Sequence, residues 1–198
     1  MNIAIFASGA GSNAAVIIKT LGSFIEKRTA AIAVVISNNE KAGVLNIATT
    51  SKIPYEIISL KNKSETQQAK VYLELLEKYR IEFIVLAGYL KKLPKDVTNA
   101  FPKKIINIHP ALLPAYGGAG MYGKHVHEAV IAAAETQSGI TVHYVDEVYD
   151  HGQIIFQTTC AVEKTDTSED LAKKILELEH KYYTEILAKT VLSQFPVK

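Results

Sequence analysis

Short runs of β-branched and other apolar residues alternate with longer amphipathic segments through the first half of this chain. The expected strands are residues 3–7, 31–36, 53–60, 83–87 and 104–108, and the expected helices begin near residues 12 and 41 and cover 66–79. Alternation of this kind is typical of βαβ units, whose strands pair in parallel. The last two strands are almost continuously apolar, as strands covered on both faces are. The pattern therefore predicts an α/β fold of the Rossmann-like kind, a mostly parallel open sheet flanked by helices.

After Pro110 the pattern changes to a loop punctuated by proline and glycine, residues 111–120. The expected elements that follow are a helix at 124–134, strands at 140–145 and 153–159, and a last helix with its cap at 166–170 that runs to about 192. Turn residues in the segment 146–152 favour a hairpin-like connection between the two strands. With 198 residues and no linker or internal repeat, we expect one domain, 1–198.

The composition argues against nucleic acid and membranes as binding partners. The chain has 22 Lys and Arg and 20 Asp and Glu, mixed along its length, so no broad positive field is present to hold nucleic acid or an anionic membrane. The longest apolar run, 30–36, is far shorter than the roughly 18 residues of a membrane helix, and the amino terminus lacks a basic and apolar leader. Cys160 is the only cysteine, which suits a reducing compartment. We expect a cytoplasmic protein that acts on small molecules.

A glycine-rich turn, residues 9–14, lies where the first strand should end and the first helix begin. Free backbone N–H groups and the positive end of a helix bind phosphate at such a turn, and glycine lets the phosphate approach. The spacing also matches the dinucleotide pattern G-x-G-x-x-G/A, so an NAD-dependent oxidoreductase is an alternative. An NAD site would need an acidic residue after the second strand, but residues 37–39 are Ser-Asn-Asn. A small phosphate is therefore the favoured ligand.

Asn107 and His109 lie at the carboxyl end of the strand expected at 104–108, where open α/β sheets bind their ligands. Residues two apart in a strand point to the same side, so an amide and an imidazolium can both donate to one developing oxyanion. A carboxylate partner would favour the imidazolium and raise the pKa of His109. One loop offers Asp146, Glu147 and Asp150 for this role, and the residues alone do not choose among them.

The remaining histidines favour structural roles. His125 and His127 are two apart on an expected helix and point about 200° from each other, so they do not converge on a metal ion. Residues 118–125 nearly match the Walker phosphate loop, but His125 replaces the hydroxyl that would bind magnesium. His143 falls within an alternating strand, where packing or a structural hydrogen bond is the simpler interpretation. We therefore expect no metal site and no NTPase.

Taken together and in this order, the motifs resemble the phosphoribosylglycinamide formyltransferases of purine biosynthesis. The matching segments span nearly the whole chain: residues 9–13, 86–90, 107–114, 142–145, 150–152 and 179–180. The resemblance implies transfer of the formyl group of 10-formyltetrahydrofolate, a co-substrate, to the amine of glycinamide ribonucleotide. It implies a nucleotide-phosphate half at 1–100 and a catalytic and folate-binding half at 101–198, with no metal.

The same resemblance implies a role for each site residue. The backbone of Gly11, Ser12 and Asn13 would hold the nucleotide's phosphate, and Glu179 its ribose hydroxyls. In the catalytic group, Asn107 and His109 would stabilise the oxyanion, and Asp150 would keep His109 protonated and help to move the proton of the amine. The folate pterin would lie against two segments and the strand end, namely Leu90, Lys91, Lys92, Leu93, Asp146, Glu147, Val148, Tyr149, Asp150 and Asn107.

Four residues depart from that family's usual pattern. Ala111 stands where a serine is common, and Lys92 where an apolar residue is common in the folate segment. His151 and Gln153 interrupt the Gly-Gly-Pro that often follows the catalytic aspartate, which leaves the shape of that loop open.

Related enzymes share the Asn-x-His motif and the aspartate, so the resemblance supports the chemistry more strongly than the acceptor. The alternatives are hydrolysis of 10-formyltetrahydrofolate, formyl transfer to another amine, and a binding protein without turnover. Methionyl-tRNA formyltransferases and the hydrolases carry further domains for which 198 residues leave no room, so we expect the nucleotide as acceptor. The sequence carries no signal for the oligomeric state.

Overall fold

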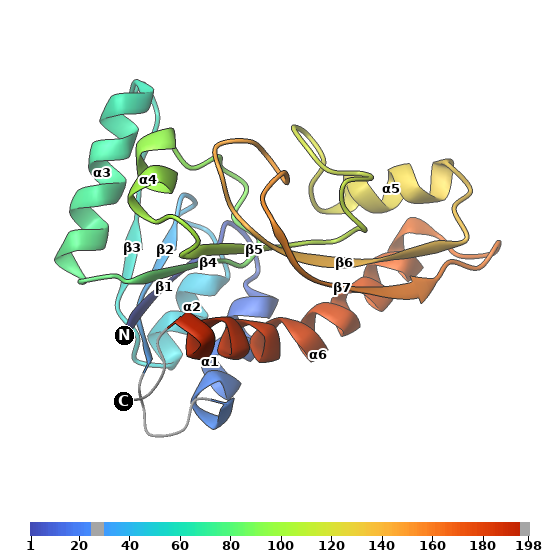
Figure 1. Ribbon diagram of the computed structural model, residues 1–198, viewed down its shortest axis with the longest axis horizontal. Helices are drawn as coiled ribbons and strands as arrows, with labels where there is room; N and C mark the ends of the chain where they lie inside the picture. The colour runs from blue at the N-terminus through green and yellow to red at the C-terminus, as the bar shows by residue number, and fades with distance from the viewer. Residues whose placement is uncertain (25–29, 195–198) are drawn as a thin grey trace.

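The computed structural model describes residues 1–24 and 30–194. Its elements in chain order are β1 (Asn2–Phe6), α1 (Ser12–Phe24), β2 (Ala31–Ser37), α2 (Val44–Thr50), β3 (Tyr55–Ile57), α3 (Glu65–Lys78), β4 (Phe83–Leu86), α4 (Lys95–Ala100), β5 (Ile105–His109), α5 (Lys124–Ala132), β6 (Gln137–Tyr144), β7 (Ile154–Ala161) and α6 (Ser168–Gln194). The described strands form one seven-stranded sheet in the order β3-β2-β1-β4-β5-β6-β7 (Figure 1). Strands β1 to β5 pair in parallel, and β6 and β7 are antiparallel additions. The α/β class with a mostly parallel sheet is therefore confirmed.

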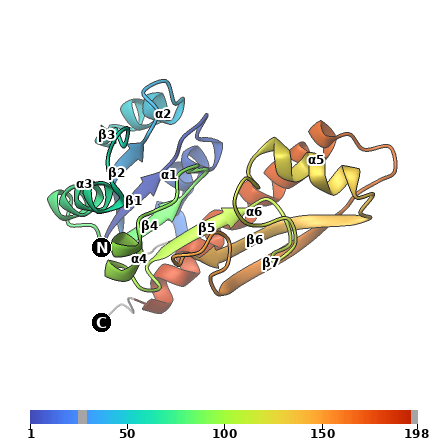
Figure 2. The same ribbon diagram turned by 90° about the horizontal axis from the view of Figure 1, so that it is seen from above.

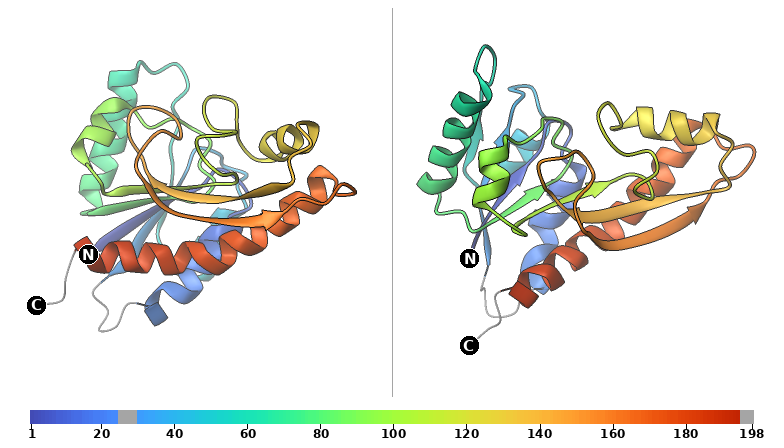
Figure 3. Two further views of the ribbon diagram at one scale, coloured as in Figure 1. Left: turned by 45° about the vertical axis from the view of Figure 1, so that its right-hand side comes forward. Right: turned by 45° about the horizontal axis from the view of Figure 1, so that its top comes forward.

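Helices cover both faces of the sheet (Figure 2). Strand alternation sets the two layers: Ile3 and Ile5 of β1 pack in one apolar cluster with α1, α2 and α6, whereas Ala4 and Phe6 pack in the other with α3 and α4. The 27-residue helix α6 runs beneath the sheet from the antiparallel strands to α1 (Figure 3). Its Tyr183 hydroxyl donates a hydrogen bond of 2.7 Å to the carbonyl of Leu86. This contact fixes α6 against the carboxyl end of β4.

The strand order changes direction next to β1: β2 and β3 follow on one side of it, and β4 to β7 follow on the other. Strand β1 pairs with β2 on one side and with β4 on the other, so the connections that follow β1 and β4 leave in opposite directions. A crevice at such a switch point is the usual ligand site of an open α/β sheet. Two hydrogen bonds join the two strand ends here: Ser8 N–H donates to Gly88 O at 3.0 Å, and Leu90 N–H donates to Ser8 Oγ at 2.9 Å.

Two helices begin at caps that the sequence encodes locally. Before α3, Ser64 Oγ accepts from the N–H of Gln67 while Gln67 Oε1 accepts from the N–H of Ser64, which is a capping box. Before α6, Thr167 and Asp170 exchange the same pair of bonds at 3.2 Å each. The cap expected at 166–170 is therefore confirmed.

Some elements differ from the expectation. The strand expected at 53–60 is only the three-residue edge strand β3, and α4 was not expected at all. Helix α2 starts at Val44 instead of near 41, because the side chain of Asn39 accepts from the N–H of Lys41 and holds a turn there. Within the described residues, no helix combines the length and the apolar character that crossing a membrane requires.

Candidate active site

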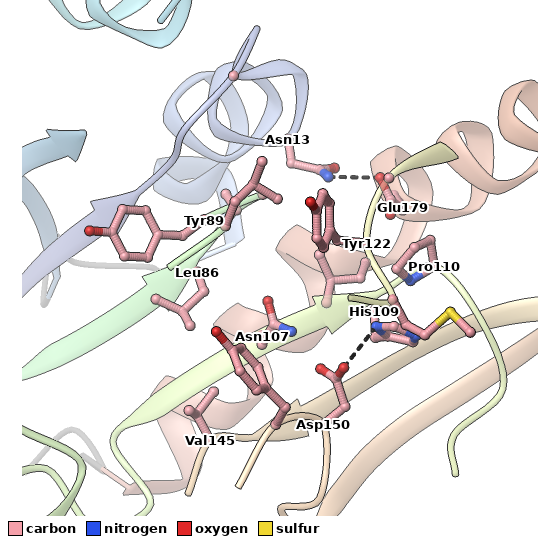
Figure 4. Close-up of a pocket in the computed structure, with 18 of the residues that line it drawn as sticks. Asn13, Leu86, Tyr89, Asn107, His109, Pro110, Tyr122, Val145, Asp150 and Glu179 are labelled. Carbon is pink, nitrogen blue, oxygen red and sulfur yellow. Dashed lines mark hydrogen bonds and ion pairs between the residues drawn. The ribbon is translucent and has the colours of Figure 1, made fainter. Parts of the chain in front are cut away.

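A cavity of about 470 Å³ opens at the carboxyl ends of β1, β4 and β5. Its wall is made by the turn after β1, the segment after β4, the end of β5, the loop before α5, the β6–β7 loop and α6, as Figure 4 shows in part. The residues expected to act on the nucleotide and on the formyl group all line it: Gly11, Ser12, Asn13, Asn107, His109, Asp150 and Glu179. Segments far apart in sequence thus converge on one site.

His109 is a buried imidazole with a partner on each ring nitrogen. Its Nε2 lies 2.8 Å from the carbonyl oxygen of Tyr116, so Nε2–H donates to that oxygen. Its Nδ1 lies 3.5 Å from Oδ2 of Asp150 (Figure 4). This is longer than a formed hydrogen bond, so Nδ1 is the nitrogen left for a substrate.

The pKa of His109 is lower than that of a free histidine. Burial lowers it most, Asp150 and the carbonyl of Tyr116 raise it, and the neighbouring His143 lowers it further. Asp150 does raise the pKa of His109, as expected of a carboxylate partner, but desolvation of the imidazolium outweighs this attraction and the net shift is downward. Asp150 still favours the protonated form in relative terms.

Asp150 itself reaches the site through an unusual backbone. Its φ is 53°, in the left-handed region that Asp and Asn adopt more readily than most residues. A Cβ on Gly117 would lie 3.2 Å from the Cβ of Asp150 and 2.5 Å from the side chain of Leu113, so the glycine leaves room for this approach. Gly118 N–H donates to Asp150 Oδ2 at 2.9 Å. Burial raises the pKa of Asp150, but the nearby imidazoles of His143 and His109 and the hydrogen bond from Gly118 outweigh it and hold the pKa below its usual value.

His143 orients the amide of Asn107. Nδ1 of His143 lies 2.8 Å from the carbonyl oxygen of Tyr144, so it carries a proton and donates to that oxygen. In the neutral ring Nε2 then holds a lone pair, which accepts from Nδ2 of Asn107 at 3.2 Å. One N–H of the amide is thus used by the protein and the other is left for the cavity. His143 does make the structural hydrogen bond that we expected, and it also lines the cavity.

The glycine turn after β1 is tightly constrained. Gly11 has a φ of 81°, and a Cβ there would lie 2.7 Å from the Cβ of Val44. Ser12 is the first residue of α1, so backbone N–H groups of the helix start lie beside the cavity. Because a larger residue at 11 would displace α2, the variant Gly11→Val would test the packing of the turn together with ligand binding.

Glu179 of α6 faces this turn. Asn13 Nδ2 donates to Glu179 Oε2 at 2.8 Å, a link that Figure 4 shows between the two helices. Burial raises the pKa of Glu179, against the hydrogen bond from Asn13, which lowers it. The structure therefore brings Asn13 of the turn expected to bind phosphate into contact with Glu179, the residue expected to bind the ribose hydroxyls.

The residues expected to hold the pterin also line the cavity, with one exception. Those that line it are Leu90, Lys91, Lys92, Leu93, Asn107, Asp146, Val148, Tyr149 and Asp150. Glu147 does not: its carboxylate lies 2.8 Å from Nζ of Lys95 in an exposed ion pair. The ammonium of Lys92 lies 5.8 Å from the ring centroid of Tyr149. The Lys92–Tyr149 pair therefore joins the two expected folate segments, and the Lys95–Glu147 pair joins α4 to the β6–β7 loop.

His151, one of the residues that depart from the family pattern, is accommodated within the β6–β7 loop. Its Nδ1 lies 3.0 Å from Oδ2 of Asp146, whose Oδ1 accepts from the N–H of Val148. Gly152 remains essential for the loop, because a Cβ there would lie 1.9 Å from the carbonyl oxygen of Tyr144.

His127 and Tyr122 are among the cavity residues for which no role was expected from the sequence. His127 lies on the buried face of α5 with Val126 and Val130, while His125 points outward, as their spacing predicted. A histidine on the apolar stripe of an amphipathic helix was the available signal. Within residues 1–24 and 30–194, no group of three or more His, Cys, Asp or Glu side chains is arranged to hold a metal ion.

Comparison with known proteins adds one family match, two relatives and one solved structure. The family described as formyl transferase matches residues 1–187. Phosphoribosylglycinamide formyltransferase of Bacillus subtilis is 38% identical over 187 residues, covering 93% of this chain and 91% of that protein. The chloroplastic phosphoribosylglycinamide formyltransferase of Arabidopsis thaliana is 39% identical over 93% of this chain, which spans 63% of that protein's length. The crystal structure of phosphoribosylglycinamide formyltransferase from Bacillus halodurans superposes with a TM-score of 0.88 at 35% identity, covering 98% of this chain and 96% of that one.

Proposed function

Since the chain belongs to the formyl transferase family, we propose that it transfers the formyl group of 10-formyltetrahydrofolate to the amine of glycinamide ribonucleotide. The observation that carries this proposal is the position of Asn107, His109 and Asp150 in the middle of one cavity. The same cavity is lined by the glycine turn with Glu179 and by residues of the segments 90–93 and 146–150. Such a cavity suits a nucleotide and a pterin bound together, with residues that can stabilise an oxyanion where the formyl group passes from one to the other.

In the proposed reaction, the nucleotide's amine attacks the formyl carbon and a C–N bond forms. The carbonyl oxygen becomes an oxyanion, to which the free N–H of Asn107 and Nδ1–H of His109 donate. Asp150 offsets the positive charge of His109 and accepts a proton, directly or through water, from the substrate nitrogen, which becomes cationic once its C–N bond has formed. The bond from the formyl carbon to N10 of the folate then breaks, N10 takes up a proton, and formylated nucleotide and tetrahydrofolate leave.

The two ends of the cavity suit the two substrates. Backbone N–H groups of Gly11, Ser12 and Asn13 at the start of α1 would bind the phosphate, and the ionised Glu179 would accept from the ribose hydroxyls. The pterin would lie between the backbone of 90–93 and the β6–β7 loop, over the apolar side chains of Leu86 and Val145. The site residues thus lie in both halves of the chain, which we propose to act as one domain built on a single sheet.

The test is formyl transfer followed by the absorbance change as the folate loses its formyl group, with and without glycinamide ribonucleotide. We expect turnover only with the nucleotide, a formylated nucleotide as product, and loss of most turnover in His109→Ala with the fold retained. Equal deformylation without nucleotide would identify a hydrolase. Binding of both ligands with no turnover would identify a binding protein, and either result would refute the proposal.

A further inference from the structure

His127 is a buried histidine of α5 for which the proposed reaction has no role. Its side chain is 7% exposed and lines the cavity. The imidazole makes no hydrogen bond with any residue of 1–24 or 30–194, and its Nδ1 is sealed from solvent. Buried polar groups in proteins almost always have a partner. Nδ1 is closed off, whereas His127 lines the cavity and Nε2 is not sealed, so Nε2 is the nitrogen that a ligand in the cavity can reach.

The surroundings of His127 fix its charge and its tautomer. Burial lowers the pKa of His127, and so does the neighbouring His109, and both favour the neutral ring. A buried N–H without an acceptor is rarer than a buried lone pair without a donor. Since Nδ1 is the sealed atom, the proton belongs on Nε2. His127 thus presents one N–H donor to the cavity.

The position of α5 indicates which substrate this donor meets. Helix α5 packs against α6, which carries Glu179, and lies away from α4, which follows the segment 90–93 (Figures 1 and 2). His127 is also close enough to His109 for the two imidazoles to affect each other's charge. His127 thus lines the part of the cavity wall that α5 forms beside α6.

Glycinamide ribonucleotide has one strong uncharged hydrogen-bond acceptor between its ribose and its reacting amine. The phosphate goes to the turn at 11–13 and the ribose hydroxyls go to Glu179, whereas the amide carbonyl lies between the ribose and the reacting amine. We propose that Nε2–H of His127 donates to this amide carbonyl and so holds the amine toward Asn107 and His109. This inference rests on the proposed function, and it makes His127 a binding residue specific for the glycinamide part of the acceptor.

The experiment compares two ligands that differ only in that part, glycinamide ribonucleotide and ribose 5-phosphate, by calorimetry. His127→Leu should bind glycinamide ribonucleotide about tenfold more weakly, the loss expected for one buried hydrogen bond of about 1.4 kcal/mol. Its affinity for ribose 5-phosphate and for 10-formyltetrahydrofolate should stay within twofold of the parent. His127→Gln, which keeps an N–H donor, should recover most of the loss. The matched control is His125→Gln, two residues away on the exposed face of α5, which should change neither affinity.

Equal losses for the two ligands would overturn the inference, because they would mean that His127 only supports the fold. Unchanged affinity for glycinamide ribonucleotide would also overturn it. A measurement on the parent protein covers the case in which His127→Leu does not fold: the ¹⁵N shift of Nε2 of His127 should move on addition of glycinamide ribonucleotide but not of ribose 5-phosphate. Turnover by the parent protein is a separate readout, so a selective loss of binding without turnover would refute the proposed function and keep the inference.

Discussion

Replacing Asp150 with asparagine removes one negative charge from between two imidazoles and keeps the shape of the side chain. Asp150 Oδ2 lies 3.5 Å from Nδ1 of His109, and its Oδ1 lies 3.6 Å from Nε2 of His143. An asparagine retains an oxygen to accept from the N–H of Gly118 and tolerates the φ of 53° at this position. Asp150→Asn therefore separates the effect of charge from that of geometry.

The magnitude follows from the short distance and the burial of the pair. Two unit charges about 4 Å apart attract by about 4 kcal/mol at an effective dielectric constant of 20, and about 1.4 kcal/mol corresponds to tenfold in rate. The largest loss of rate expected from removing this attraction is therefore about a thousandfold. A hydrogen-bond donor to an oxyanion typically raises the rate by about a hundredfold to a thousandfold. We expect kcat for formyl transfer to fall by about a hundredfold to a thousandfold, with little change in the KM of either substrate.

The pH profile gives the sign of the effect. Burial already holds the pKa of His109 low, and removing Asp150 takes away a group that raises it. Protonated His109 is lost as the pH rises, so the alkaline limb of kcat should move to lower pH in Asp150→Asn. The control is Asp96→Asn, which removes the same charge from an exposed position on α4. A kcat within threefold of the parent, or an alkaline limb that stays in place or moves to higher pH, would refute the reasoning.

Three further predictions concern other parts of the site and the sheet. In His143→Leu, Asn107 loses the acceptor that orients its amide, so kcat should fall about tenfold while both substrate affinities stay unchanged; a loss confined to KM would contradict this. Because burial raises the pKa of Glu179 and only the carboxylate accepts from two hydroxyls, the nucleotide's KM should rise as the pH falls through that pKa, and the dependence should be absent in Glu179→Gln. In Gly139→Ala the new Cβ would lie 2.0 Å from the carbonyl oxygen of Thr158, so thermal unfolding should show a loss of about 3 kcal/mol or more; an unchanged melting temperature would rule out this close approach.

The main elements of the fold were predictable because their side chains repeat with a clear period. Strands β1, β4 and β5 are buried on both faces, and α3 carries its own cap, so each is encoded within a few residues. The short elements were not predictable in the same way. Helix α4 has six residues and β3 has three, and both depend on what they pack against. The single-domain α/β class therefore followed from the sequence, whereas these boundaries did not.

The site was predictable where strand geometry decides it. Asn107 and His109 point to one side because they are two apart in β5, and they both line the cavity. The residues alone did not select Asp150 over Asp146 and Glu147, because the choice depends on a left-handed backbone and on the space left by a glycine in another loop. His143 was missed as the support of Asn107 because strand register is not visible in one sequence: the two residues are direct partners across β5 and β6.

The loop before α5 holds both members of the His109–Asp150 pair at once. The carbonyl of Tyr116 raises the proton affinity of His109, and the N–H of Gly118 lowers that of Asp150. With the loop in place, both contacts favour the proton on the imidazole over the proton on the carboxylate. If these two peptide groups moved away together, the histidine would hold its proton less tightly and the aspartate would attract one more strongly. The backbone of residues 116–118 therefore helps to set the difference in proton affinity between His109 and Asp150. A shift of this loop would make the two proton affinities more equal.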